Sequence, residues 1–222
     1  MFKNITVGQA VFGAAVTSLI MGGFVVASRF GISNITSVAD LTFFRYLSGL
    51  LLLPVFLTRP IKNLGGIGWW RGIMITVLAG WCFNLVIMSG FKFAPAAHGA
   101  VFTPGTLPMF TAVYSYFLFK ERLSVWRILG LISLMGGLIM LGWGGLLETS
   151  PDTWKGDLLF LFASACWAGF TVCIRYWNID PVYGVSLVAV LSFFTFTPIY
   201  IVFFDFTVLS LPIEEIVLQF IY

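Results

Sequence analysis

A few polar side chains interrupt the long, membrane-length apolar stretches of this sequence, and these are the residues that could do chemistry. Arg45 lies about two turns into the stretch Val38–Leu57, so its guanidinium can either meet an anionic group in a cavity or extend to the polar interface. Arg29, at the end of the first stretch, is more typical of an interfacial anchor. Trp81 and Asn84 are three residues apart and therefore share one face of a helix. The Asn84 amide needs a partner, either on another helix or on a ligand.

Two prolines make the fourth apolar stretch, Gly99–Phe119, irregular. Pro104 and Pro108 each remove a backbone donor and clash with the preceding turn, and their spacing kinks one face of the helix. Broken backbone at membrane depth persists only where protein or a water-filled cavity satisfies it. We therefore expect this helix to hinge there and, with Phe102, to line a substrate cavity; the other interpretation is a buried kink that serves packing. His98, just before the stretch, is expected to be interfacial.

Other kinds of chemistry find no support in the residue pattern. The sequence shows no nucleophile–base pair, metal-ligand cluster or phosphate-cradling loop, so no enzyme is expected and no cofactor or metal is implied. The three cysteines lie inside apolar stretches without metal-ligand spacing. The Lys and Arg residues are scattered near the ends of the stretches, without the clustered patch that binds nucleic acid.

Seven apolar stretches must position these residues, and they take up most of the chain. Six contain no charged residue, and Val38–Leu57 carries Arg45 near its start. Because a helix rises 1.5 Å per residue, about 20 residues cross a hydrocarbon core of roughly 30 Å. Only 9% of the residues are charged, against about 25% in soluble domains. We therefore expect an all-α polytopic membrane protein, a helical bundle with the spans Val7–Ser28, Val38–Leu57, Gly72–Phe91, Gly99–Phe119, Ile128–Leu147, Leu158–Ile174 and Pro181–Phe204.

The positive charges divide unevenly between the two sides of these spans. With the N-terminus inside, the inner side holds Lys3, Arg59, Lys62, Arg71, Lys120, Arg122, Arg127 and Arg175, and the outer side holds Arg29, Arg45, Lys92 and Lys155. The positive-inside rule then predicts that the N-terminus lies in the cytoplasm. The membrane expected is the inner, cytoplasmic membrane. Asp40 is assigned to the outer end of its stretch, so no acid is expected within the spans, which argues against a carboxylate proton relay.

An internal repeat predicts two units. Residues Leu19–Arg29 resemble Ala165–Arg175, and five spans separate the two copies, so the second copy is inverted in the membrane. Inverted repeats of this kind are common in secondary transporters. We place the first repeat, with five spans, at residues 1–147 and a partial second repeat at 148–222, with an eighth span starting after Phe204. The partial repeat favours a fragment of a longer protein over a natural short form.

A motif around the fourth and fifth spans resembles the EamA-type repeat of the drug/metabolite transporter superfamily. Pro108 precedes Glu121 by thirteen residues, Glu121 opens the turn Glu121-Arg122-Leu123-Ser124, and Gly130 follows nine residues after Glu121. The runs Gly22–Arg29, Phe44–Tyr46 and Gly156–Leu158 are also similar to that family. The resemblance gives Arg29, Glu121 and Gly130 the role of structural motif residues. It implies a design of five plus five helices, truncated here in the second half.

The resemblance also implies a function. It indicates a multi-pass transporter that exports small metabolites, with amino acids as the commonest expectation, across the cytoplasmic membrane by alternating access. The partners expected are the lipid bilayer and a small-molecule substrate. A carboxylate on that substrate is the group that Arg45 is expected to contact. The chain is compatible with a homodimer. No nucleic acid is expected as a partner. The alternative function is a non-transporting membrane subunit or an inactive fragment of a longer transporter.

Overall fold

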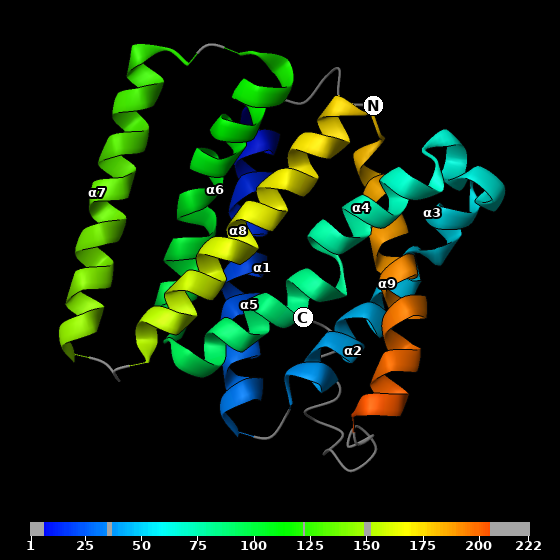
Figure 1. Ribbon diagram of the computed structural model, residues 1–222, viewed down its shortest axis with the longest axis horizontal. Coiled ribbons are helices and arrows are strands. Elements are labelled where there is room, and N and C mark those ends of the chain that lie inside the picture. The colour runs from blue at the N-terminus through cyan, green and yellow to red at the C-terminus, as the bar shows by residue number, and fades with distance from the viewer. Residues whose placement is uncertain (1–6, 35–36, 122, 149–151, 205–222) are drawn as a thin grey trace.

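The computed structural model describes residues 7–34, 37–121, 123–148 and 152–204, and within these ranges every regular element is a helix (Figure 1). The elements are α1 (Val7–Asn34), α2 (Val38–Gly49), η1 (Leu50–Leu52), α3 (Leu53–Leu57), η2 (Ile61–Gly66), α4 (Trp69–Ala79), α5 (Trp81–Phe93), α6 (Ala96–Phe119), α7 (Val125–Glu148), α8 (Thr153–Tyr176) and α9 (Pro181–Phe203). The predicted all-α class is confirmed. The start of an eighth span, expected after Phe204, lies outside the described residues.

Each predicted stretch corresponds to a helix or to a broken helix. The second stretch divides into α2, a 3-10 turn and α3, and the third divides into α4 and α5 at Gly80. Five segments are long and apolar enough to cross a membrane within the described residues: Val11–Ser28, Val38–Leu57, Trp69–Phe93, Thr153–Tyr176 and Pro181–Phe203. The other two predicted stretches correspond to α6 and α7, and the number of crossings stays a prediction.

Helices α2 and α9 begin with side-chain caps that the sequence specifies. Ser37 accepts a hydrogen bond from the backbone N–H of Asp40, and the Asp40 carboxylate accepts one from the Ser37 N–H, which together form a capping box. Asp180 caps α9 by accepting from the N–H of Tyr183 at 2.9 Å. These acceptors satisfy backbone donors that the first helical turn leaves unpaired. At the far end of α6, Lys120 adopts a left-handed conformation with φ of 55° and turns the chain toward α7.

Helix α8 lies between α5 and α6 and forms the centre of the bundle (Figure 1). It approaches α5 closely because Gly156 has no side chain: a Cβ there would lie 2.5 Å from Ala94 Cβ and 2.8 Å from the Gly90 carbonyl oxygen. The ring of Phe160 packs beside Phe91 with centroids 5.0 Å apart. Helix α7 lies at one edge of the bundle and packs mainly on α6.

The pairing of α9 with α2 and α3 is antiparallel. Tyr200 near the end of α9 contacts Asp40 and Phe43 near the start of α2, whereas Tyr183 at the start of α9 stacks on Phe56 of α3. Between these points, Ala189 Cβ lies 3.0 Å from the position of a Cβ on Gly49. A helix of the predicted second repeat therefore packs along the whole second helix of the first.

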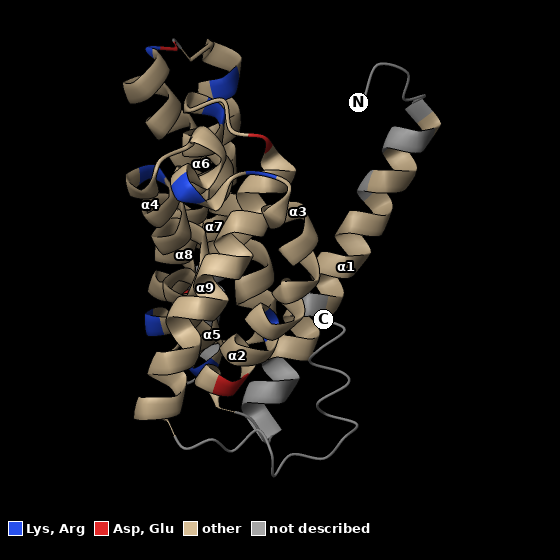
Figure 2. Ribbon diagram, turned by 90° about the vertical axis from the view of Figure 1, so that its right-hand side faces the viewer, with Lys and Arg blue, Asp and Glu red and all other residues tan. Residues whose placement is uncertain are grey.

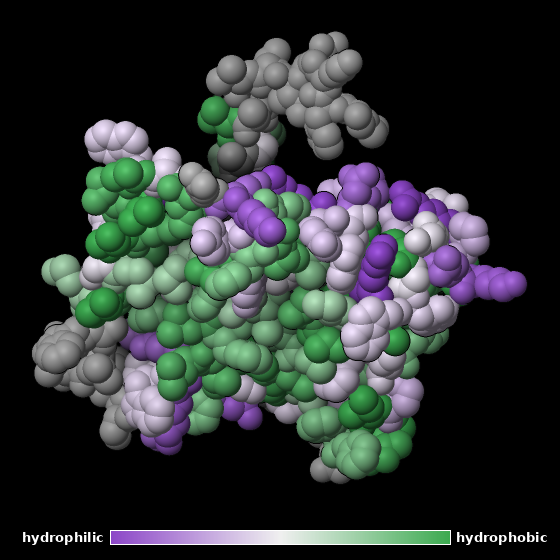
Figure 3. Space-filling view, turned by 45° about the horizontal axis from the view of Figure 1, so that its top comes forward, coloured by the Kyte–Doolittle hydropathy of each residue, from purple (hydrophilic) through white to green (hydrophobic). Residues whose placement is uncertain are grey.

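The surface fits a lipid environment. Large apolar side chains such as Phe12, Leu19, Met140 and Phe203 are more than two thirds exposed, a pattern that soluble monomers avoid over large areas. Figure 3 shows a broad green, hydrophobic zone with purple, hydrophilic residues gathered along its edges. The chain is therefore a multi-pass membrane protein, as predicted.

Most of the basic residues lie at one end of the bundle, in the upper part of Figure 2. We call this the basic end; it holds the connections α3–α4, α6–α7 and α8–α9 (Figure 1). Three of its arginines lie against aromatic rings: the guanidinium carbons of Arg59, Arg175 and Arg71 lie 4.4, 4.5 and 5.6 Å from the ring centroids of Tyr183, Phe119 and Trp177. The positive-inside rule predicts that this end faces the cytoplasm.

Candidate functional site

The membrane-length segment Trp69–Phe93 is broken at Gly80, close to its middle. Gly80 has φ of −89° and ψ of −149°, which ends α4, and its carbonyl then accepts from the N–H of Asn84 at 3.0 Å in α5. A side chain on Gly80 would collide with the Thr76 carbonyl oxygen and with Oγ of Ser192 on α9. Discontinuous helices are typical of substrate sites in transporters, because their free backbone groups can face a ligand.

Asn84, one of the predicted site residues, lies one turn after this break. It is fully buried, and its Nδ2 donates to Oγ1 of Thr42 on α2 at 2.9 Å. The Thr42 hydroxyl in turn donates to the Val38 carbonyl at 2.7 Å, so it accepts one hydrogen bond and donates another. The Asn84 Oδ1 atom, by contrast, has no hydrogen-bond partner among the described residues. One half of the amide thus joins two helices and the other half is a buried acceptor that a donor on a ligand could satisfy.

Trp81 lies in the first turn of α5 and is half-buried. Its ring packs against Phe196 of α9 with centroids 5.6 Å apart, in the cluster that also contains Phe44 and Tyr200. Trp81 and Asn84 therefore lie on neighbouring parts of α5 but contact different helices, α9 and α2.

Arg45 is half-buried in the middle of α2. Its carbonyl accepts from the Ser48 hydroxyl at 2.8 Å. The next residue, Tyr46, is buried, and its hydroxyl lies 3.5 Å from the carbonyl oxygen of Ala79, the last residue of α4. The α2 segment that carries Arg45 thus packs at the Gly80 break.

The expectation that no acid lies within the spans is wrong for Asp40. Asp40 is only 2% exposed, lies inside α2, and accepts hydrogen bonds from the Tyr200 hydroxyl and from Ser37 Oγ. A buried carboxylate is stabilised when several donors surround it. The sequence carried a signal for this role, because Ser37 and Asp40 have the spacing of a capping box. The partner Tyr200, 160 residues away, had no such signal.

Helix α6 continues through both prolines. Pro104 and Pro108 are exposed, whereas Phe102 is 8% exposed and packs with Phe91, Phe160 and His98. Side-chain hydroxyls bond backbone carbonyls near the prolines: Ser164 of α8 donates to the Thr103 carbonyl at 2.9 Å, and Thr106 and Thr111 donate to carbonyls of their own helix. The Ser164 bond joins α8 to α6 next to Pro104. The hinge and the cavity wall stay predictions.

His98 lies in the first turn of α6, and its position at the membrane interface stays a prediction. His98 is 7% exposed, and its Nδ1 lies 2.8 Å from Oδ1 of Asp157 on α8. At the basic end, Arg175 Nη2 of α8 donates to Glu121 Oε1, just after α6, at 2.7 Å. The parallel helices α6 and α8 are thus joined at one end by the His98–Asp157 hydrogen bond and at the other by the Arg175–Glu121 ion pair. The second contact agrees with the structural role expected for Glu121.

The two remaining motif residues contribute no described side-chain contact to the site. Gly130 in α7 is exposed, and a Cβ there would meet no atom within 4 Å. Arg29 lies within α1, and its side chain is outside what the structure describes.

These features define the class of the protein: a polytopic α-helical membrane protein with a broken helix and a buried polar contact at membrane depth. Comparison with known proteins gives the family. The EamA-like transporter family matches residues 8–143, more than half of the chain. The chain belongs to this family, which confirms the resemblance seen in the sequence.

One curated relative is an uncharacterized transporter, YoaV of Bacillus subtilis (strain 168). It is 23% identical over 160 residues, which cover 72% of this chain and 54% of that protein. The chain therefore matches only about half of the length of this relative. No solved structure is significantly similar.

Proposed function

We propose that this protein takes part in the export of a small metabolite across the cytoplasmic membrane by alternating access, with the N-terminus in the cytoplasm. The substrate class proposed is an amino acid or a related compound that bears a carboxylate. Membership of a transporter family supports transport in general. The substrate, the direction and the mechanism are the proposal.

The observation that carries the proposal is the buried Asn84 acceptor beside the Gly80 break. Burying a polar group at membrane depth without a hydrogen-bond partner costs free energy. The Asn84 Oδ1 atom is such a group, and a donor on a ligand, such as an ammonium group, would satisfy it. Arg45, on the helix that carries Thr42, is the proposed partner of a substrate carboxylate, because its planar guanidinium can form two parallel hydrogen bonds with one.

The test is uptake of a panel of labelled amino acids into inverted membrane vesicles that contain the full chain. We expect weaker affinity in Arg45→Lys, which keeps the charge and loses the planar fork, and loss of transport in Arg45→Ala. Arg29→Lys is the matched control and should have a mild effect. Wild-type affinity in Arg45→Ala would make Arg45 an interfacial anchor.

A second candidate function rests on the short match to YoaV, which covers 54% of that protein. A chain with part of a transporter could serve as a non-transporting membrane subunit or be an inactive fragment. Absence of uptake for every member of the panel, with normal amounts of folded protein in the vesicles, favours this candidate.

A further inference from the structure

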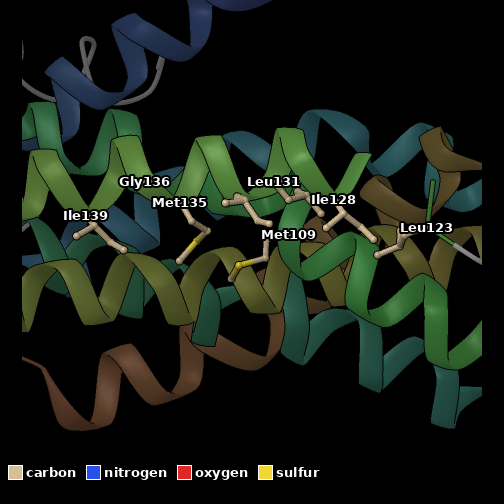
Figure 4. A pocket seen from close by; sticks show the side chains of 8 residues that line it. Met109, Leu123, Ile128, Leu131, Met135, Gly136 and Ile139 are labelled. Carbon is tan, nitrogen blue, oxygen red and sulfur yellow. The ribbon is translucent and has the colours of Figure 1, made fainter. Parts of the chain in front are cut away.

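An open apolar groove runs between α6 and α7 on the edge of the bundle, with a volume of about 470 Å³ (Figure 4). We call it the α6–α7 groove; it is lined by Met109 of α6, Leu123 of the connecting turn, and the face of α7 from Ile128 to Ile139, which includes Met135 and Gly136. The lining side chains carry only carbon and sulfur (Figure 4). A polar metabolite would find no hydrogen-bonding side chain there. A hydrocarbon chain forms no hydrogen bonds and therefore suits this lining.

The groove matches the depth of one membrane leaflet. From Ile128 to Ile139 a helix rises about 17 Å at 1.5 Å per residue. This is about half of a hydrocarbon core of roughly 30 Å. Trp126, 83% exposed in the first turn of α7, marks the level of the membrane interface at one end of the groove. The groove therefore extends from the interface toward the middle of the bilayer.

Two exposed basic residues lie close in sequence to the lining residues at the interfacial end of the groove. Lys120 and Arg127 are both exposed; they lie in the turn with Leu123 and directly before Ile128. Neither forms an ion pair with a carboxylate of the described residues, and the one acid of the turn, Glu121, is already held by Arg175. This arrangement of cations above an apolar groove is complementary to a negatively charged headgroup with an acyl chain.

We propose that the α6–α7 groove binds an anionic phospholipid, with one acyl chain along α7 and the phosphate beside Lys120 and Arg127. A helix of a second copy is the competing occupant, because Gly136 lines the groove and small residues allow two membrane helices to approach closely. The two cations at the interfacial end, Lys120 and Arg127, favour the lipid. This inference is independent of the transported substrate.

The test is native mass spectrometry of the purified full chain titrated with phosphatidylglycerol or with phosphatidylcholine. Gly136→Leu should abolish retention of phosphatidylglycerol, because its side chain fills the groove. Gly137→Leu is the matched control and should retain the lipid; a Cβ meets no atom within 4 Å at either glycine, so both variants should fold. Lys120→Gln and Arg127→Gln should each weaken binding about fivefold, and the double variant about twenty-five-fold.

Three results would overturn the proposal. The first is equal retention of phosphatidylglycerol by Gly136→Leu and Gly137→Leu. The second is equal affinity of the wild type for the two lipids, which would remove the headgroup contact. The third is a wild-type dimer that Gly136→Leu converts to a monomer, which would make a second copy the occupant. Thermal unfolding of each variant confirms that the comparison is made between folded proteins.

Discussion

Replacing Asn84 with leucine should make the protein more stable and less active. Leucine keeps the branch at Cγ but removes both polar atoms of the amide. The lost hydrogen bond to Thr42 costs about 0.6 kcal/mol, the average for polar contacts between membrane helices. Removal of the unpaired Oδ1 gains about 1–3 kcal/mol of desolvation free energy. Thr42 keeps its bond to the Val38 carbonyl, so no new buried group is left unpaired. The net change is a stabilisation of about 0.4–2.4 kcal/mol.

The measurement combines thermal unfolding in detergent with uptake into vesicles. At about 2–4 °C per kcal/mol for a chain of this size, the unfolding midpoint should rise by about 1–10 °C, while uptake per folded molecule falls. A matched control is Thr171→Val on α8, which removes an exposed hydroxyl bonded to its own helix and should change neither quantity. A lower midpoint with wild-type uptake would refute the reasoning, because Asn84 would then only join α5 to α2.

Three further predictions concern orientation, the proline region and the basic end. In a variant without native cysteines, an impermeant reagent added outside should label Thr149→Cys and not Lys62→Cys; the reverse pattern would reject the predicted topology. Pro104→Ala should straighten α6 and reduce transport more than expression, and unchanged transport would make the kink a packing feature. Glu121→Gln should destabilise the protein by at most about 1 kcal/mol, since its pair with Arg175 is exposed; a loss of transport at wild-type stability would assign Glu121 a role beyond the turn.

The sequence was sufficient to predict the helices because each is specified by local information. A run of about 20 apolar residues forms a helix in lipid, since every backbone group must be satisfied within the segment. The start of α2 was also encoded locally, by the spacing of Ser37 and Asp40. The break at Gly80 was not predictable in the same way. Glycine is frequent in membrane helices, and the close approach of Ser192, one of the two groups that a side chain on Gly80 would meet, comes from a residue more than one hundred positions later.

The candidate site was predictable only in part, for the same reason. A lone Asn84 in an apolar stretch indicated a buried polar contact, but nothing local identified Thr42 as the partner. His98 and Asp40 were assigned to the interface because each lies near the end of a stretch. Their burial comes from Asp157 and Tyr200, which are brought to them by the packing of α8 and α9.

The two side-chain contacts that join the ends of α6 and α8 differ in their exposure to water. The Glu121–Arg175 contact is exposed to the water at the basic end, where salt screens charges over about 8 Å at physiological ionic strength and about 3 Å at 1 M. The His98–Asp157 contact is largely buried and is screened much less. Concentrated salt therefore weakens the Glu121–Arg175 ion pair and leaves the His98–Asp157 contact at the opposite end of the two helices intact.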